Sequence, residues 1–278
     1  MPSNNELKVL LPEVIRIARL AGDAIMQIYQ QDDLGVSYKK DESPLTLADM
    51  ASHRCIEAGL EALNIKLPVL SEESTAISWQ ERQQWQSYWL VDPLDGTKEF
   101  VKRNGEFTVN IALIRDGIPV LGVVYAPVPD ELYYAAEDEG AFFQIGDKSP
   151  EKLVLDPEFE PDCWRVVGSR SHGASRLETF SECLPDYRNV PMGSSLKLCM
   201  VAANRSDLYV RFGPTCEWDT AAAQAVVEQA GGAVFDDQLQ PLRYNHKESL
   251  LNPEFVVCQK RNELWAERYL SLVEPVIG

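Results

Sequence analysis

The 278-residue chain has little positive charge: 26 Lys and Arg residues stand against 43 Asp and Glu residues, for a net charge of −17 at pH 7. A surface with this balance repels nucleic acid and anionic membranes. We therefore expect no nucleic-acid partner. The charges are interspersed with apolar residues, so the acidity does not indicate a disordered chain.

Long apolar runs, a secretion signal and paired cysteines are also missing. No stretch approaches the roughly 18 consecutive apolar residues that a membrane span requires, so we expect no stable membrane insertion. The N-terminal segment lacks a basic start and spaces its apolar residues as an amphipathic helix does. The six cysteines contain no CxxC pair, which favours reduced core thiols of a cytosolic protein over a zinc site or disulfides.

The length and periodicity favour a large mixed α/β fold. Apolar spacing predicts helices over 6–30 and 46–63, then a β-rich segment with a hairpin at "RDG". Strands and helices alternate in the second half, which argues for a mixed α/β layer. A polar, proline-bearing stretch places a boundary near residue 155. We expect an α+β half over 1–155 and an α/β half over 156–278.

Four acidic positions stand at predicted element ends, and each has a simple structural explanation. Asp92 and Asp95, in "LVDPLDGTKEF", follow an apolar run and suit a turn. Asp219, in "EWDTAAA", suits a helix start. Asp49 stands three residues after Thr46, as in a capping box. Glu72, in "LSEES", adds a further carboxylate directly after a predicted strand.

Together these carboxylates suggest more than local capping. Active sites of α/β proteins collect at element ends, and carboxylates gathered in one place repel each other. A divalent cation removes that repulsion, and hard oxygen ligands are what Mg²⁺ prefers. Bound Mg²⁺ can activate water and stabilise a leaving oxygen in phosphoryl chemistry. The residues alone therefore lead to the hypothesis of a Mg²⁺ site. The sequence does not show whether these carboxylates lie close together in space.

The motifs also resemble a known family. "DPLDGT", with "SEES" upstream and "WDTAAA" downstream, is similar to the inositol monophosphatase superfamily over nearly the whole chain. "VGSRSH", "GSSLKLC" and "RFGPTCEWDTAA" resemble its 3′(2′),5′-bisphosphate nucleotidase branch. Inositol monophosphatases usually have an Asn soon after "DGT", where this chain has Lys98 and Glu99.

The resemblance implies a fold and a metal site. The implied fold is a layered αβαβα sandwich, with an antiparallel sheet in the first half and a mixed sheet in the second. Two or three Mg²⁺ ions and inhibition by Li⁺ are implied, and Thr97 and Asp49 match the pair that orients the attacking water, with Glu72 as a further catalytic residue. The implied metal ligands are Glu72, Asp92, the carbonyl of Leu94, Asp95 and Asp219.

A second group of residues is expected to hold substrate. Ser194, as a helix N-cap, and Lys197, in the first helical turn, could bind a phosphate, and Arg211 would face the same region. The resemblance places His172 near the nucleotide. A solvated Lys, a surface Arg and an idle loop His are the structural alternatives. Gly96, Thr97 and Asp219 complete the implied substrate-binding set.

The resemblance implies hydrolysis of adenosine 3′,5′-bisphosphate to AMP and phosphate in sulfur assimilation, with the sulfated form as a further substrate. An inositol or sugar monophosphatase and a family member that has lost catalysis are alternatives. A non-catalytic, Ca²⁺-binding module would need a D-x-D-x-D-G loop, which the sequence lacks. We expect a cytoplasmic protein; attachment to the cytoplasmic face of the inner membrane, and the choice between monomer and homodimer, stay open.

Overall fold

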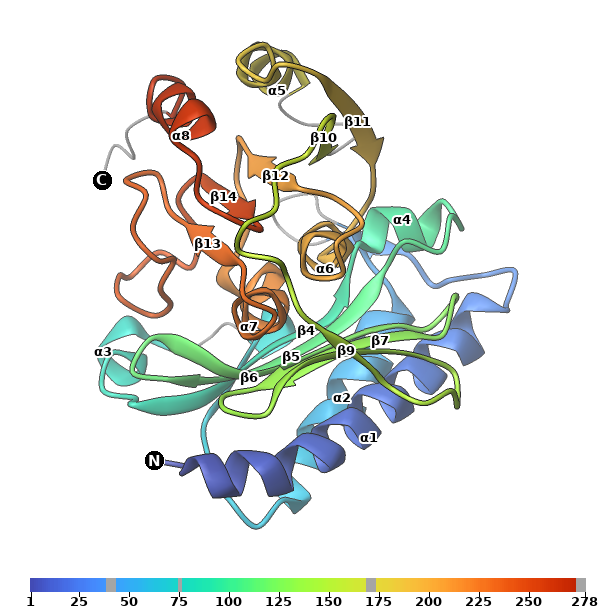
Figure 1. Cartoon of the computed structure of the whole chain (residues 1–278). Coiled ribbons are helices and arrows are strands. Elements are labelled where there is room, and N and C mark those ends of the chain that lie inside the picture. The colour runs from blue at the N-terminus through green and yellow to red at the C-terminus, as the bar shows by residue number, and fades with distance from the viewer. Residues whose placement is uncertain (39–43, 75–76, 169–173, 274–278) are drawn as a thin grey trace.

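The computed structural model describes residues 1–38, 44–74, 77–168 and 174–273. Its elements stack in five layers, seen from bottom to top in Figure 1. Helices α1 and α2 cover one face of a seven-stranded sheet; α6 and α7 lie between this sheet and a five-stranded sheet; and α5 and α8 cover the outer face of the second sheet. This order agrees with the expected αβαβα sandwich.

The first layer consists of α1 (Asn4–Tyr29) and α2 (Leu47–Ala62). Both begin with a capping box, made by Ser3 with Glu6 and by Thr46 with Asp49. Each box satisfies backbone N–H groups that have no partner inside the helix, which explains why the helices begin there. Both helices were predicted, and their bounds agree with the prediction to within two residues. A two-stranded ribbon, β1 (Ser37–Tyr38) with β2 (Pro44–Leu45), lies between them in the chain.

The first sheet is antiparallel at every pair of neighbouring strands except one. Strand β3 runs parallel to β4, which corrects the expectation of a purely antiparallel sheet. The parallel pair brings both carboxyl ends to one edge, beside the short helices η1 (Glu72–Ser74) and α4 (Thr97–Val101), whereas the short helix α3 (Trp79–Arg82) precedes the amino end of β4. The strands, in sheet order, are β3 (Val69–Ser71), β4 (Ser87–Asp95), β5 (Thr108–Arg115), β6 (Ile118–Ala126), β7 (Glu131–Ala136), β8 (Gly140–Ile145) and β9 (Glu151–Leu153).

The middle layer packs very closely on the first sheet. A Cβ atom at Gly122 in β6 would lie 2.1 Å from the carbonyl oxygen of Ala222 in α7 (Ala221–Gln229). Only glycine on the strand and small residues on the helix permit this approach, which explains the alanine run that begins α7. Helix α6 (Leu196–Ala202) lies beside α7 between the two sheets (Figure 1).

The second sheet is mixed, as expected. Strand β10 pairs in parallel with β11 and β12, and β14 pairs antiparallel with β12 and β13. The edge strands β11 and β13 were not predicted, because β11 is largely polar and β13 is very short. The elements are β10 (Trp164–Gly168), α5 (Ala174–Ser181), β11 (Tyr187–Pro191), β12 (Leu208–Arg211), η2 (Glu217–Asp219), β13 (Ala233–Phe235), β14 (Phe255–Cys258) and α8 (Glu263–Leu270).

The two halves share a core. One buried cluster contains Leu90 and Val124 from the first sheet together with Val226 of α7 and Val257 of the second sheet. The boundary near residue 155 falls between β9 and β10 and stays a prediction about chain organisation. No disulfide joins the six cysteines, all of which are described. Within the described residues, no helix has the length and apolar character needed to cross a membrane.

Candidate active site

Strand β4 supplies two carboxylates from one strand end. Its register against β5 pairs Asp92 with Asn110 and Asp95 with Thr108, so a bulge lies between the two aspartates. Residues three apart in a regular strand point to opposite faces. The bulge changes that alternation, and both side chains reach the same space.

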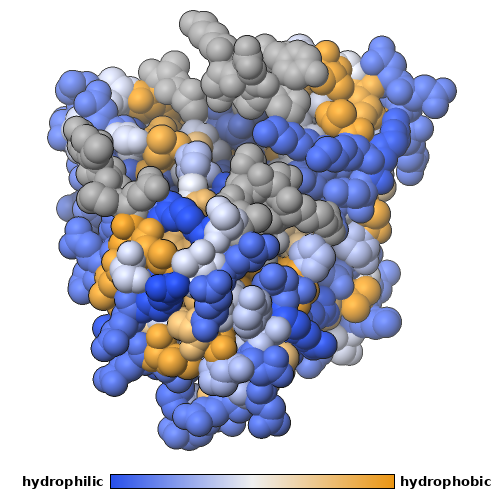
Figure 2. All heavy atoms as spheres, turned by 90° about the horizontal axis from the view of Figure 1, so that it is seen from above, coloured by the Kyte–Doolittle hydropathy of each residue, from blue (hydrophilic) through white to orange (hydrophobic). Residues whose placement is uncertain are grey.

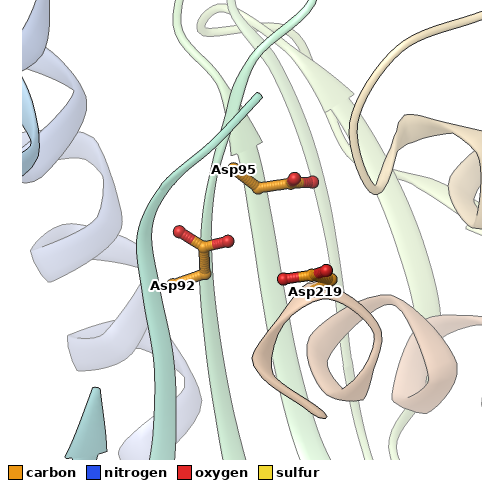
Figure 3. Close-up of side chains that lie close together, drawn as sticks. All are labelled: Asp92, Asp95 and Asp219. Carbon is orange, nitrogen blue, oxygen red and sulfur yellow. The ribbon is translucent and has the colours of Figure 1, made fainter. Parts of the chain in front are cut away.

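Asp219 enters this space from the other half of the chain. It ends η2, two residues before α7 begins, and its Oδ2 accepts a hydrogen bond from the Cys216 N–H at 2.9 Å. Asp92, Asp95 and Asp219 each offer an oxygen, and these oxygens lie within 4.8 Å of one another (Figure 3). The expected convergence of these three residues is therefore present in the fold.

Two further predicted ligands lie beside this cluster. Strand β3 ends at Ser71, which pairs with Val91, so Glu72 follows at the level of Asp92. Glu72 and Leu94 line the same cavity as the aspartates. The carbonyl oxygen of Leu94 lies 3.4 Å from the hydroxyl oxygen of Thr97.

The electrostatics of the cluster favour a bound cation. Burial raises the pKa of Asp92 well above its usual range, and repulsion from Glu72, Asp95 and Asp219 raises it further. Burial followed by repulsion from Asp95 does the same to the pKa of Asp219. A divalent cation would relieve that repulsion, and the donor set consists of hard oxygen atoms. The residues present therefore fit Mg²⁺.

Asp49 and Thr97, the pair expected to orient the attacking water, lie within hydrogen-bond distance of each other. Thr97 Oγ1 donates to Asp49 Oδ1 at 3.3 Å, while Asp49 Oδ2 accepts from the Thr46 N–H at 2.7 Å in the capping box. Burial raises the pKa of Asp49, and the hydrogen bonds from Thr46 oppose that shift. The capping and the catalytic interpretations of Asp49 are compatible, because each uses a different oxygen.

A cavity of about 460 Å³ adjoins the aspartates. Lys197 is only 7% exposed, and its Nζ donates to the Ser194 carbonyl at 2.6 Å and lies 5.5 Å from the centre of the Tyr209 ring. Arg211 ends β12 and donates to the carbonyls of Gly213 and Pro214. Among the described residues, four cationic side chains line the cavity: Lys98, Lys102, Lys197 and Arg211.

The expectation for Ser194 needs correction. The N-cap of α6 is Ser195, whose side chain makes no capping bond, and Ser194 has a left-handed backbone with φ 56°. Ser194 Oγ donates instead to Asp95 Oδ2 at 2.6 Å, and the Ser195 N–H donates to the same oxygen. A carboxylate is a stronger acceptor than a neutral group. The donors predicted to be available at the start of α6 therefore bind the Asp95 carboxylate.

The remaining predicted residues lie as follows. Gly96 lines the cavity and precedes α4 with φ 93°, a conformation that glycine adopts without strain. His172 lies outside the described residues. Tyr209 and Lys102 line the cavity but were not predicted. Period-2 spacing from Arg211 along the same strand could have identified Tyr209.

The comparisons with known proteins agree with this geometry. The model of the inositol monophosphatase family matches residues 6–277. The chain belongs to the inositol monophosphatase family. It is 51% identical over 249 residues to the 3′(2′),5′-bisphosphate nucleotidase CysQ of Shigella flexneri, covering 89% of this chain and 99% of that protein. It is 50% identical over 249 residues to the CysQ of Escherichia coli (strain K12), with the same coverage.

A solved family structure is also similar. The crystal structure of CysQ from Bacteroides thetaiotaomicron matches with a TM-score of 0.78 and 41% sequence identity, covering 90% of this chain and 97% of that one. The family is metal-dependent and typically uses Mg²⁺, which is consistent with the acidic cluster.

Seen from the side of α5 and α8, the surface is mostly hydrophilic, with apolar side chains in separate small groups (Figure 2).

Proposed function

We propose that this protein is a Mg²⁺-dependent 3′(2′),5′-bisphosphate nucleotidase that hydrolyses adenosine 3′,5′-bisphosphate to AMP and phosphate. The observation that carries the proposal is a carboxylate cluster beside a cavity lined by Lys98, Lys102, Lys197 and Arg211. A monophosphate needs the carboxylate site alone, whereas a second phosphate needs local positive charge. The similarity to CysQ proteins supports the same substrate class.

Glu72, Asp92, Asp95, Asp219 and the Leu94 carbonyl would hold the Mg²⁺ ions. When bound, Mg²⁺ supplies positive charge that orients the transferred phosphate and stabilises the leaving oxygen. We propose that the site holds two or three Mg²⁺ ions. Replacement of one Mg²⁺ by Li⁺ would inhibit the enzyme.

Thr97 and Asp49 move the proton of the attacking water. The Thr97 hydroxyl accepts this proton and passes its own to Asp49 Oδ1, along the 3.3 Å contact. The water oxygen bonds to phosphorus as the bond from phosphorus to the ribose 3′-oxygen breaks. The 3′-oxygen leaves with the electron pair and takes a proton from solvent.

Lys197 and Arg211 bind the phosphate that is not cleaved, next to the proposed substrate contacts of Gly96, Thr97, Ser194 and Asp219. Lys197 is buried against Tyr209, so its charge acts at short range with little competition from water. His172 remains a proposed neighbour of the adenine. The same site would accept the sulfated nucleotide, 3′-phosphoadenylyl sulfate, which would give the enzyme a place in sulfur assimilation.

The test compares phosphate release from adenosine 3′,5′-bisphosphate and from inositol 1-phosphate. Each substrate is assayed with Mg²⁺, with a chelator, and with added Li⁺. We expect Mg²⁺-dependent, Li⁺-sensitive release that strongly favours the nucleotide. A preference for the inositol phosphate would keep the metal site and overturn the assignment of Lys197 and Arg211. Release from neither substrate would contradict the proposed activity.

A further inference from the structure

Helix α2 contacts three different segments that carry the candidate active site. Asp49 accepts from Thr97 of α4, as described above. One turn later, Ser52 Oγ donates to the Pro93 carbonyl in β4 at 2.7 Å. The next residue, His53, has its Nδ1 3.0 Å from the hydroxyl of Ser71, which ends β3. Positions three and four apart lie on one helix face, so one face of α2 reaches all three segments.

Ser52 holds the peptide unit that orients Asp92. The Pro93 carbonyl and the Leu94 N–H belong to one planar peptide unit. Ser52 binds the oxygen of this unit, and the Leu94 N–H donates to Asp92 Oδ1 at 3.0 Å. Pro93 lies in the bulge, where the sheet ladder is interrupted, so its buried carbonyl needs a donor from elsewhere. Ser52 is fully buried and supplies that donor.

His53 holds the turn that carries Glu72. Its Nε2 lies 3.1 Å from the Glu57 carboxylate, and the Glu73 N–H donates to Ser71 Oγ at 3.3 Å. With the imidazole proton on Nε2, one direction satisfies every contact: Glu73 N–H to Ser71, Ser71 O–H to His53 Nδ1, and Nε2–H to Glu57. The backbone of η1 is thereby connected to α2 on both sides of Glu72.

We infer that Ser52 and His53 are positioning residues for the cation, Ser52 through Asp92 and Leu94, and His53 through the Glu72 turn. The inference rests on the proposed Mg²⁺ site. Neither side chain is among the proposed ligands or the proposed substrate contacts. Groups that orient metal ligands typically contribute about 10–100-fold to metal affinity, which is the effect expected here.

The first test measures Mg²⁺ binding to the metal-stripped, full-length protein by isothermal titration calorimetry, without substrate. Ser52→Ala should raise the Kd for Mg²⁺ about tenfold. Ser181→Ala is the matched control, because Ser181 is also fully buried and donates to a helix carbonyl, Leu177, at 2.8 Å. Both variants should lower the Tm by about 2–4 °C. Only Ser52→Ala should weaken Mg²⁺ binding.

The second test separates the two nitrogen atoms of His53. His53→Asn keeps a polar atom near the place of Nδ1 and can retain the contact with Ser71. His53→Gln keeps one near the place of Nε2 and can retain only the contact with Glu57. We expect about tenfold weaker Mg²⁺ binding for His53→Gln and a much smaller change for His53→Asn. At saturating Mg²⁺, the KM for adenosine 3′,5′-bisphosphate should be unchanged in both variants.

The outcomes distinguish the inference from the function on which it rests. If the unmodified protein binds no Mg²⁺, the proposed function and this inference both fail. If the unmodified protein binds Mg²⁺, and Ser52→Ala and His53→Gln bind it as tightly as the unmodified protein does, only the inference fails. Equal weakening by His53→Asn and His53→Gln would show that His53 acts through packing alone, and would overturn its positioning role.

Discussion

Asp49 uses its two carboxylate oxygens for different partners. One accepts the Thr46 N–H and begins α2, and the other accepts the Thr97 hydroxyl. Asp219 combines two roles in the same way, since Oδ2 accepts the Cys216 N–H while the residue belongs to the acidic cluster. A carboxylate has several acceptor sites, so a structural contact and a proposed catalytic contact can share one side chain.

Asp95→Asn tests the cation site with little change in shape. Asparagine keeps an oxygen that can accept from Ser194 and Ser195, so the fold should be retained. The loss of a charge should weaken Mg²⁺ binding and lower kcat by about 10²–10³-fold. Circular dichroism and calorimetry check the fold and the binding. Folded protein with unimpaired turnover would contradict the assignment of Asp95 as a ligand.

The charge of Lys197 should set the alkaline limit of substrate binding. Burial lowers the pKa of Lys197 to about 8, so its positive charge is lost as the pH rises through that value. The pH dependence of kcat/KM reports groups of the free enzyme, so kcat/KM should fall above pH 8. The effect of Lys197 on stability has the opposite sign. Its pKa is lower in the folded state than in the unfolded state, so the buried charge destabilises the fold at low pH. The free energy of unfolding should therefore increase as the pH rises through the folded-state pKa.

Lys197→Met supplies the control for this limit. The variant should raise the KM for adenosine 3′,5′-bisphosphate much more than it lowers kcat, since Lys197 is proposed to bind the phosphate that is not cleaved. Its kcat/KM should no longer fall above pH 8. If the variant keeps the same alkaline limb, the limb belongs to another group, and this prediction is wrong.

At the scale of elements, the bulge in β4 and the parallel pairing of β3 bring the site together. The bulge turns Asp92 and Asp95 toward the same space, and the pairing of Ser71 with Val91 brings Glu72 beside them. Helix α7 brings Asp219 from the opposite side. The position of each carboxylate therefore depends on how its element packs on the first sheet.

Gly122→Ala tests the packing that places Asp219. The new Cβ would lie 2.1 Å from the Ala222 carbonyl oxygen, so α7 must move away from β6. We expect a loss of about 1–3 kcal/mol in the free energy of unfolding and weaker Mg²⁺ binding, because Asp219 lies only two residues before the first residue of α7.

A matched glycine variant controls for the added methyl group. Among the described residues, a Cβ at Gly168 would meet only the side chain of Leu177, whose end can rotate away. Gly168→Ala should cost less stability in urea unfolding and leave Mg²⁺ binding unchanged. Equal effects of the two variants on Mg²⁺ binding would show that the position of α7 does not govern the site.

At the scale of the whole molecule, a protein with a net charge of −17 is proposed to bind a polyanion. The cations of the cavity and the proposed Mg²⁺ ions would reverse the charge locally, while the rest of the surface stays acidic. The two sheets and the helices between them form one buried core that contains residues of both halves. Binding at the junction of the halves should therefore stabilise the entire fold.

Mg²⁺ should raise the Tm of the full-length protein. An ion that binds only the folded state adds about 2.7 kcal/mol at 100 times its Kd, which corresponds to several degrees. The shift should become smaller as the pH falls, because protons compete with the cation for carboxylates of raised pKa. Differential scanning fluorimetry with Mg²⁺ and with a chelator measures this. An unchanged Tm would contradict the proposed cation site.

Much of the architecture could be predicted because its signals are local. Thr46 with Asp49 marked the start of α2, and the "RDG" turn marked the β5–β6 hairpin, where Asp116 and Gly117 have φ of 52° and 77°. The short edge strands β11 and β13 escaped prediction, because their sequences carry no clear alternation. Ser194 was misplaced by one position, since its hydroxyl bonds a carboxylate 99 residues away in the chain.

The sequence alone predicted the fold class, the family resemblance and the acidic residues of the candidate site, because capping boxes, periodicity and motifs depend on near neighbours in the chain. The convergence of Asp219 on Asp92 and Asp95, and the contacts of Ser52 and His53 with the site segments, required the folded chain. These contacts join distant segments through a strand bulge, a parallel strand pair and close helix packing. No local signal encodes such distances, because they follow from the way the layers pack together.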